Sequence, residues 1–255
     1  MTDPDLPPPP PPFAPPPGYV EYAPTNWSTG LRRVGGLAKA LVIVLVIVAI
    51  GQVISVATTG SVSDAAQEYL NSDQSAAAED EFEEDLAVNG MTSLVAGAAS
   101  IAVIVLSVIW LYRVAANHRA LGRQLTWAPG WAIAGWVLPP LLFIIPLLML
   151  RESWKASAPD VPPGSQEWKQ NGESPLVWIW FLLYSVVPIV LAGLGAAQLW
   201  NFSRDTADLA EYFDEQKGLI VAQGVVTVLA AIAWGLLVRE ITRRHSEFSG
   251  EATLR

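Results

Sequence analysis

Long apolar runs separated by polar segments set the pattern of this chain. Four runs cover about 39–59, 91–112, 176–200 and 218–238, and none carries a charged side chain in its interior. An uncharged apolar run of about 18 residues or more is typical of a transmembrane helix, because such a helix spans the ~30 Å hydrocarbon core of a bilayer. The pattern predicts an all-α integral membrane protein with four transmembrane helices.

A fifth apolar stretch, about 131–150, is interrupted by Pro139-Pro140. Helical arms on either side of the two prolines would rise ~12 Å and ~15 Å, so each would reach about halfway through the hydrocarbon core. Consecutive prolines break a helix, because each lacks a backbone donor and restricts the residue before it. Two interpretations are open: a kinked helix that crosses the membrane, or a re-entrant or interfacial segment that turns back.

The basic residues distinguish these two topologies, because Lys and Arg concentrate in the short cytoplasmic loops of membrane proteins. With the N-terminus inside, a crossing fifth segment would put 8 basic residues inside and 7 outside. A segment that turns back would put 13 inside and leave only Arg204 and Lys217 outside. The charge pattern therefore favours four spans, a re-entrant segment and a multi-pass protein of the cell membrane whose two termini are cytoplasmic.

In this topology the two outer segments are strongly acidic. The segment that joins the first two spans has nine acidic residues and no basic one, and the segment before the last span has five acidic residues with Arg204 and Lys217. Both segments have helical spacing. We expect them to extend the spans as short acidic helices.

The chain also carries a weak internal repeat. Each unit consists of a span, an acidic segment with Glu-Tyr, a second span, a Trp near its inner end and an Arg shortly after. "SDAAQEYL" and "TADLAEYF" are the matching acidic parts, and Trp110 and Trp234 are the matching tryptophans. The four spans are thus predicted to form two repeated hairpins, with the proline-broken segment between them.

A polar, proline-rich segment precedes the first span. Nine prolines lie between Pro7 and Pro17, and such a run favours extended polyproline II structure without a packed core. We therefore expect residues 1–36 to be a disordered cytoplasmic tail, residues 37–245 a helical membrane domain and residues 246–255 a second cytoplasmic tail. The first apolar run begins too late for a secretory signal peptide, so we expect it to be an uncleaved span.

The sequence offers no residue set for catalysis. It has no cysteine, no ionisable residue in the middle of a span, no nucleophile elbow and no glycine-rich phosphate loop. His118 and His245 are far apart in sequence and lack partners at metal-ligand spacing, so we expect each to be solvated near the membrane surface. The protein is expected not to be an enzyme and to bind no metal, cofactor or nucleic acid.

Tryptophan and basic residues gather where the spans reach the cytoplasmic side. An interfacial belt of such residues is usual in membrane proteins. The alternative is a site for anionic lipid headgroups, since each nearby basic residue adds ~1 kcal/mol toward a negative leaflet. The candidate residues for this interface are Trp110, Arg113, Asn117, Arg119, Arg123, Trp131, Arg151, Trp154 and Lys155.

The stretch "WLYRVAANHRALG…WAPGWAIAGWVLPPLLFIIPLLMLRESWKAS" resembles a family of actinobacterial membrane proteins named domain of unknown function 4328. The resemblance extends from about Lys39 to His245 and implies an integral membrane protein without an assigned activity. Relatives place Asn, Arg and Gln around the proline that corresponds to Pro146, where this chain has Leu142, Ile145 and Leu148. The motif residues are Trp110, Arg113, Asn117, Leu121-Gly122, Pro129-Gly130-Trp131, Trp136, Pro139, Pro146, Arg151-Glu152 and Trp154.

Two function classes follow from these features. The first is an envelope-associated interaction or scaffold protein, with an acidic outer face and a proline-rich tail that binds a protein partner. The second is a small transporter, channel or lipid-handling protein, because repeated halves and broken helices recur in transport folds. The absence of intramembrane charge in the sequence argues against ion-coupled transport but not against passive or lipid transport. We favour the first class, and neither a substrate nor an oligomeric state is indicated.

Overall fold

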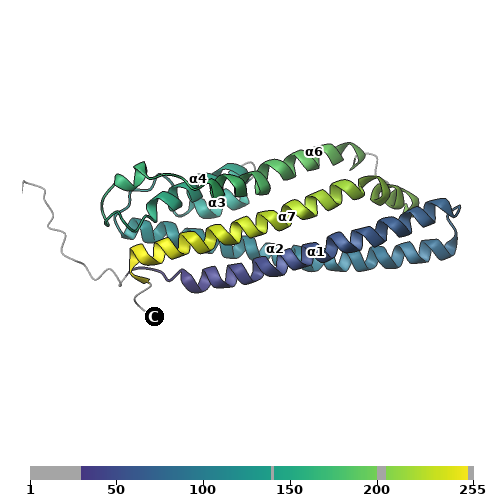
Figure 1. Cartoon of the computed structure of the whole chain (residues 1–255), viewed down its shortest axis with the longest axis horizontal. Coiled ribbons are helices and arrows are strands. Elements are labelled where there is room, and N and C mark those ends of the chain that lie inside the picture. The colour runs from purple at the N-terminus through teal and green to yellow at the C-terminus, as the bar shows by residue number, and fades with distance from the viewer. Residues whose placement is uncertain (1–29, 139–140, 200–204, 252–255) are drawn as a thin grey trace, which may run out of the picture.

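The computed structural model describes residues 30–138, 141–199 and 205–251, which form helices and loops without a β-strand. α1, α2 and α7 run along the length of the molecule, and shorter helices complete the bundle (Figure 1). The elements are α1 Gly35–Asn71, α2 Ala76–Ala120, α3 Trp131–Val137, α4 Leu141–Ala156, the 3₁₀ helix η2 Glu167–Gln170, α5 Pro175–Phe181, the π-helix η3 Leu182–Val186, α6 Val187–Leu199 and α7 Thr206–Ser249.

Four of these helical stretches are long and apolar enough to cross a membrane, judged by length and composition. They are α1, α2, the continuous stretch 175–195 and α7, and they contain the four predicted apolar runs apart from the end of the third. The predicted set of four long apolar helices is confirmed. α1, α2 and α7 also continue through the acidic segments, so the prediction that these segments extend the apolar helices is confirmed as well.

The chain reverses direction between α1 and α2 within a few residues. Asp73 and Gln74 adopt left-handed conformations, with φ of 54° and 60°. Aspartate tolerates this conformation better than most residues, because its short side chain bonds locally. Beyond the turn, Tyr69 of α1 stacks on Phe82 of α2, with their ring centroids 6.2 Å apart. The two helices therefore leave the turn already packed against each other.

The third long helical stretch changes its winding before a proline. η3 is a π-helical turn, and Pro188 follows it in α6. A proline inside a helix lacks the N–H that would bond four residues back, and a wider turn is one way in which helices adjust to this loss. At the other end, Ser174 and Pro175 begin the stretch, and Ser174 Oγ accepts a hydrogen bond from the Leu176 N–H at 3.2 Å.

α3 and α4 lie antiparallel on one side of the bundle. A Cβ added at Gly135 would lie 2.7 Å from Cβ of Ile145, so the two helices touch at this position. Farther out, Glu152 Oε2 accepts a hydrogen bond from the Trp127 N–H at 3.1 Å. These pairings join early residues of one arm to late residues of the other, so the chain returns to the end from which it came.

Aromatic side chains pack together between these helices and α7. Trp180 lies at 4.8 Å from Tyr184 and 4.9 Å from Trp234, measured between ring centroids. Trp136 of α3 contacts all three of these rings. Such rings bury large apolar areas and are favourable in edge and offset arrangements. The cluster thus ties the short helices to α7.

α1 and α7 also approach closely in the other half of the molecule. A Cβ at Gly224 would overlap the side chain of Val56 and lie 3.2 Å from Nε2 of Gln52. A larger residue at Gly224 would therefore push α1 and α7 apart. Small residues permit this kind of close helix–helix contact.

Several predictions concern the ends of the chain and the two central prolines. Most of the predicted proline-rich tail, Pro139-Pro140, Trp200 and the last four residues lie outside the described residues. The predicted second tail begins at residue 246, whereas α7 continues to Ser249 and is followed by Gly250 with φ of 75°. Left-handed glycine is a frequent residue just beyond the end of a helix.

Candidate functional sites at the two ends of the bundle

The two ends of the bundle have different chemistry. The start of α1, the end of α2, the loops around α3 and α4 and the end of α7 meet at one end (Figure 1), which we call the terminal end. Residues 61–90 and 205–217 form the opposite end, which we call the acidic end. The nine residues predicted as an interface all lie in the half of the molecule that contains the terminal end, and the structure shows what each of them contacts.

Trp110 is fully buried rather than part of an interfacial belt. Its Nε1–H donates to Thr242 Oγ1 at 3.0 Å, and its ring meets Trp234 edge to face at 5.8 Å. Trp234 in turn donates to Ser107 Oγ at 2.9 Å. The two tryptophans that match in the internal repeat therefore contact each other and hold α2 against α7.

The expectation that the two histidines are solvated is wrong. His118 and His245 are both fully buried, and their rings lie edge to face with centroids 4.8 Å apart. The end of α2 and the end of α7 bring them together, although 127 positions separate them in the sequence. His118 Nε2 lies 3.1 Å from Ser157 Oγ, which joins this pair to the loop after α4.

Asn117 holds the chain that enters α1. Its Oδ1 accepts from the Arg32 N–H at 2.8 Å, and its Nδ2 donates to the Arg32 carbonyl at 2.8 Å. The same Nδ2 lies 3.1 Å from His245 Nε2. Because an amide nitrogen only donates, the neutral imidazole accepts at Nε2 and carries its proton on Nδ1. Asn117 is thus fully used by internal partners.

Arg123 organises the loop between α4 and η2. Its side chain is almost fully buried, and its two terminal nitrogens donate to the carbonyls of four loop residues. The guanidinium also lies over the Phe248 ring at 4.4 Å. Burial lowers the pKa of Arg123, and Asp160 opposes this effect, but an arginine stays protonated at any physiological pH. The four carbonyls belong to Ala158, Val161, Pro162 and Ser165.

Arg151 and Lys155 of α4 form ion pairs with Glu173, just before α5. Arg151 Nε donates to Glu173 Oε2 at 2.8 Å, and Lys155 Nζ lies 3.2 Å from Oε1. The hydrogen bond from Arg151 is the main reason that the pKa of Glu173 falls to about 2, and Lys155 contributes. Nearby, the guanidinium of Arg244 lies 4.4 Å from the Trp154 ring centroid.

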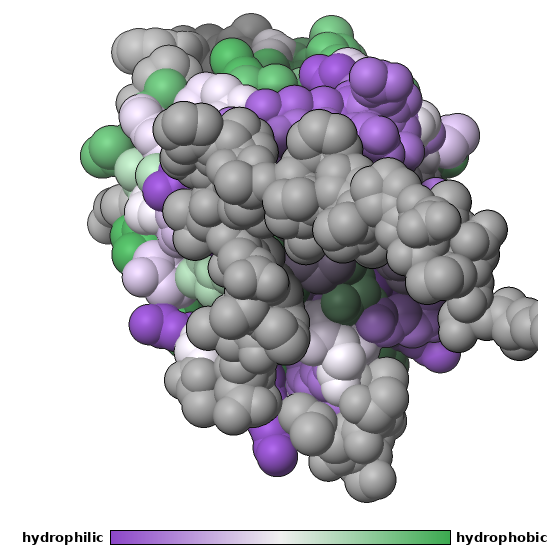
Figure 2. Space-filling model, turned by 90° about the vertical axis from the view of Figure 1, so that its left-hand side faces the viewer, coloured by the Kyte–Doolittle hydropathy of each residue, from purple (hydrophilic) through white to green (hydrophobic). Residues whose placement is uncertain are grey.

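Six of the nine candidates remain able to meet a headgroup. Trp110, Asn117 and Arg123 are buried, so a headgroup cannot reach their side chains. Arg119 and Trp131 are exposed, whereas Arg113, Arg151, Trp154 and Lys155 are partly buried. Hydrophilic residues cover much of the coloured surface at the terminal end (Figure 2). The lipid-headgroup role of these six residues stays a prediction.

The acidic end is built on its own small apolar core. Val62, Ala66 and Tyr69 of α1, Ala78 and Phe82 of α2, and Ala210 of α7 are buried together there. Its polar links between helices are exposed, with Lys217 Nζ 2.9 Å from Asp64 Oδ1 and Gln67 Nε2 donating to Asp214 Oδ1 at 2.6 Å. Fourteen acidic residues against one basic residue, Lys217, in residues 61–90 and 205–217 make this end strongly negative.

The buried polar groups of the terminal end were not predictable as a site from their spacing. His118, Asn117 and Arg123 read as a polar continuation of a span, and nothing in their pattern marks His245 as a partner. The internal repeat held the one usable signal, because Trp110 and Trp234 match and are in contact. In the part of the chain that the structure describes, no three His, Cys, Asp or Glu side chains are placed to hold a metal ion.

Comparisons with known proteins give one family and no closer relative. No curated protein and no solved structure was found to match the chain. The family described as "Domain of unknown function (DUF4328)" matches residues 73–243, which include the turn after α1, the whole of α2 to α6 and most of α7. Since this match covers more than half of the sequence, the chain belongs to the DUF4328 family.

Proposed function

We propose that this protein is an integral membrane scaffold that presents a folded acidic surface on the outer side and its proline-rich tail on the cytoplasmic side. Large apolar side chains stand exposed along the middle of the long helices, for example Ile47, Ile101, Ile189 and Ile232. Contiguous exposed apolar surface of this kind fits a lipid environment. The four helices are then the membrane spans.

The pairing of α3 with α4 supports a four-span topology. Gly135 packs on Ile145, and the Trp127 N–H donates to Glu152, so α3 starts from the terminal end and α4 returns to it. A re-entrant segment must be covered by protein, because lipid cannot satisfy its broken backbone. The aromatic contacts of Trp136 with Trp180 and Trp234 supply such cover for α3.

The observation that carries the scaffold proposal is the acidic end. α1, α2 and α7 run past their apolar stretches as continuous helices and pack on each other around Phe82 and Tyr69. An irregular loop would be sufficient to connect these helices, so the folded helical extension is not needed for connection alone. A helical projection with many more acidic than basic residues gives a fixed surface that attracts a cationic partner by electrostatic complementarity. In the other half, Trp110, Trp136, Trp180 and Trp234 pack in the core, and the hollow of about 190 Å³ beside the last three is lined mainly by apolar side chains.

Topology is tested by single cysteines in the cysteine-free chain. Ser75 lies exposed in the turn between α1 and α2, and Gln170 lies exposed at the end of η2. In intact cells Ser75→Cys should react with a membrane-impermeant thiol reagent, whereas Gln170→Cys should react only after permeabilisation. Labelling of Gln170→Cys from outside would show that the α3–α4 segment crosses, and the proposed topology would be wrong.

The scaffold role is tested by photocrosslinking in cells from the acidic end. A photoreactive residue at the exposed position 83 should give a discrete adduct, and the change of Asp80, Glu81 and Glu84 to Asn, Gln and Gln should remove it. The matched control places the photoreactive residue at the exposed Glu167 of the terminal end. An absent adduct, or an adduct that survives charge neutralisation, would contradict the proposal.

A further inference from the structure

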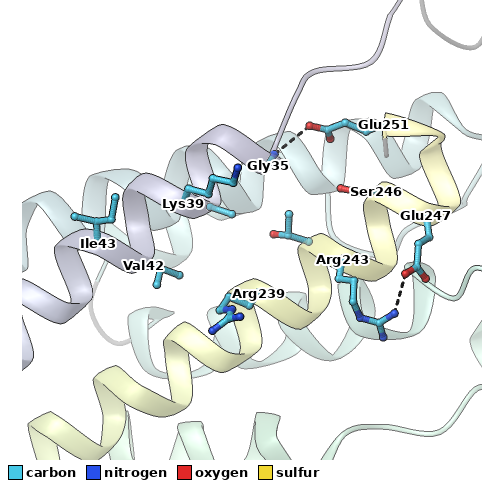
Figure 3. A pocket seen from close by; sticks show the side chains of 11 residues that line it. Gly35, Lys39, Val42, Ile43, Arg239, Arg243, Ser246, Glu247 and Glu251 are labelled. Atoms are coloured by element: carbon cyan, nitrogen blue, oxygen red, sulfur yellow. Dashed lines mark hydrogen bonds and ion pairs between the residues drawn. The ribbon is translucent and has the colours of Figure 1, made fainter. Parts of the chain in front are cut away.

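A groove runs between the first turns of α1 and the last turns of α7. A cavity of about 570 Å³ lies at the end of this groove nearest the terminal end. Lys39 and Ile43 of α1 line one side of it, and Arg239, Thr242 and Ser246 of α7 line the other. A second hollow of about 160 Å³ continues from it and shares Val42 and Arg239 with the first. Because the two hollows share lining residues, they adjoin along α1 and α7 and are treated together as the groove. Figure 3 shows the larger hollow, which is the one toward the terminal end.

Two positive charges at the wide part of the groove lack an acidic partner. Among the described residues, Lys39 and Arg239 take part in no ion pair, and both are exposed. Of the other charges nearby, Arg243 pairs with Glu240 and Glu247. The carboxylate of Glu251, which also lines the cavity, is turned to the start of α1, where it accepts from the Val34 and Gly35 N–H groups. Figure 3 shows Lys39 on α1 and Arg239 on the facing α7. The groove thus offers two cations that have no ion-pair partner among the described residues.

The narrow part of the groove is apolar. Its walls are Val42, Leu45, Val46 and Ala49 of α1 and Ala231, Ile232, Gly235 and Leu236 of α7. Val46, Ile232 and Leu236 are each about half exposed, so this wall faces outward rather than into the core. From Lys39 to Ala49 the helix rises ~15 Å, which equals the depth of one leaflet of a ~30 Å hydrocarbon core.

The geometry points to a binding site for one anionic glycerophospholipid in the leaflet at the terminal end. The headgroup phosphate lies between the Lys39 ammonium and the Arg239 guanidinium, and one acyl chain follows the apolar wall toward Ala49. Charge-assisted bonds from both cations hold the phosphate, and the apolar wall gives affinity in proportion to the chain length that it covers. The site rests on membrane insertion but not on the scaffold role, and it is separate from the belt of Trp131, Arg151 and Lys155.

The test measures lipid binding to the purified full-length chain in a mild detergent, by native mass spectrometry during titration with long-chain phosphatidylglycerol. We expect one tightly bound lipid per chain, and a loss of at least about tenfold in affinity when Lys39→Gln is combined with Arg239→Gln. The matched control combines Arg33→Gln with Lys169→Gln, which removes the same charge from exposed positions that do not line the groove and are not among the predicted headgroup residues. The control should bind like the wild-type protein.

Two further arms separate a lipid from a free phosphate. Inorganic phosphate should not displace the bound lipid, because it lacks the apolar contacts. Gly235→Leu fills the apolar part of the groove, and it should weaken long-chain phosphatidylglycerol several-fold while leaving a short-chain form unaffected. Unchanged thermal unfolding of each variant shows that it is folded. Equal loss in the control pair, absence of a retained lipid, or displacement by phosphate would overturn the proposal.

Discussion

The same three helices, α1, α2 and α7, are held together differently at the two ends of the molecule. At the terminal end, buried polar side chains link segments that are distant in sequence: Asn117 binds Arg32, His118 meets His245, and Arg123 holds a whole loop. At the acidic end, a few small and aromatic residues form the core and the polar links are exposed. Hydrogen bonds between buried polar groups favour the arrangement that forms them, although His118 Nδ1, His245 Nδ1 and Arg123 Nε are buried without a hydrogen-bond partner among the described residues. The contacts at the terminal end therefore determine how the helices are arranged. At the acidic end, by contrast, a change of surface charge should have little effect on stability.

The largest effect should come from Arg123→Ala. Four loop carbonyls lose their donor in a buried place, and leaving such groups unpaired costs about 3–5 kcal/mol. Unfolding followed by tryptophan fluorescence in a lipid nanodisc measures this loss, and proteolysis of residues 157–170 should accelerate. Arg119→Ala, at an exposed position on the same end, is the control. Similar stability of the two variants would show that the loop does not depend on Arg123.

Phe82→Ala should have the next largest effect, and the effect should stay local. Removal of a fully buried ring costs about 3 kcal/mol. Hydrogen exchange should therefore accelerate for amides 62–89 and remain unchanged for amides 110–123, because the terminal end has its own contacts. Val88→Ala, at a position that is 47% exposed, should change neither region. Faster exchange at both ends of the Phe82→Ala protein would break the comparison.

A smaller, pH-dependent effect should come from Glu173. Its pKa is lowered from 4.5 to about 2 in the folded protein, so the folded carboxyl binds a proton less readily than the unfolded one. The stabilisation from this group is complete above pH 4.5 and is lost as the pH falls from 4.5 toward 2. We expect a loss of about 1 kcal/mol over this range, discounted for partial exposure. Glu173→Gln should lack this component of the pH dependence, measured as the difference from the wild-type unfolding curves.

The smallest effect should come from Asp64→Asn at the acidic end. The ion pair between Asp64 and Lys217 has side chains that are 76% and 40% exposed, and exposed pairs contribute little to stability. The unfolding midpoint should stay within experimental error of the wild-type value at both low and high salt. A clear, salt-sensitive drop would mean that the acidic end is fixed by its charges, contrary to the comparison.

The apolar pattern alone predicted the long helices, because a long uncharged apolar run is a local feature of the sequence. It indicates a helix without any knowledge of the residues that pack against it. Their continuation through the acidic segments followed from helical spacing. The contacts at the terminal end did not follow, since a buried histidine and a solvated one look alike in a sequence. Arg123 shows the same limit: a basic residue after a span resembles an interfacial anchor, and only the folded loop reveals its four carbonyl partners.

The two hydrogen bonds between Asn117 and Arg32 have a mechanical consequence. They join the backbone ahead of α1 to the end of α2, and Asn117 also touches His245 of α7. A force applied to the N-terminal segment would act on both hydrogen bonds at once. It would be transmitted through Asn117 to α2 and α7 before it reached α1. The three long helices would therefore share tension from anything tethered to that segment, and the first turn of α1 would not have to unwind to carry it.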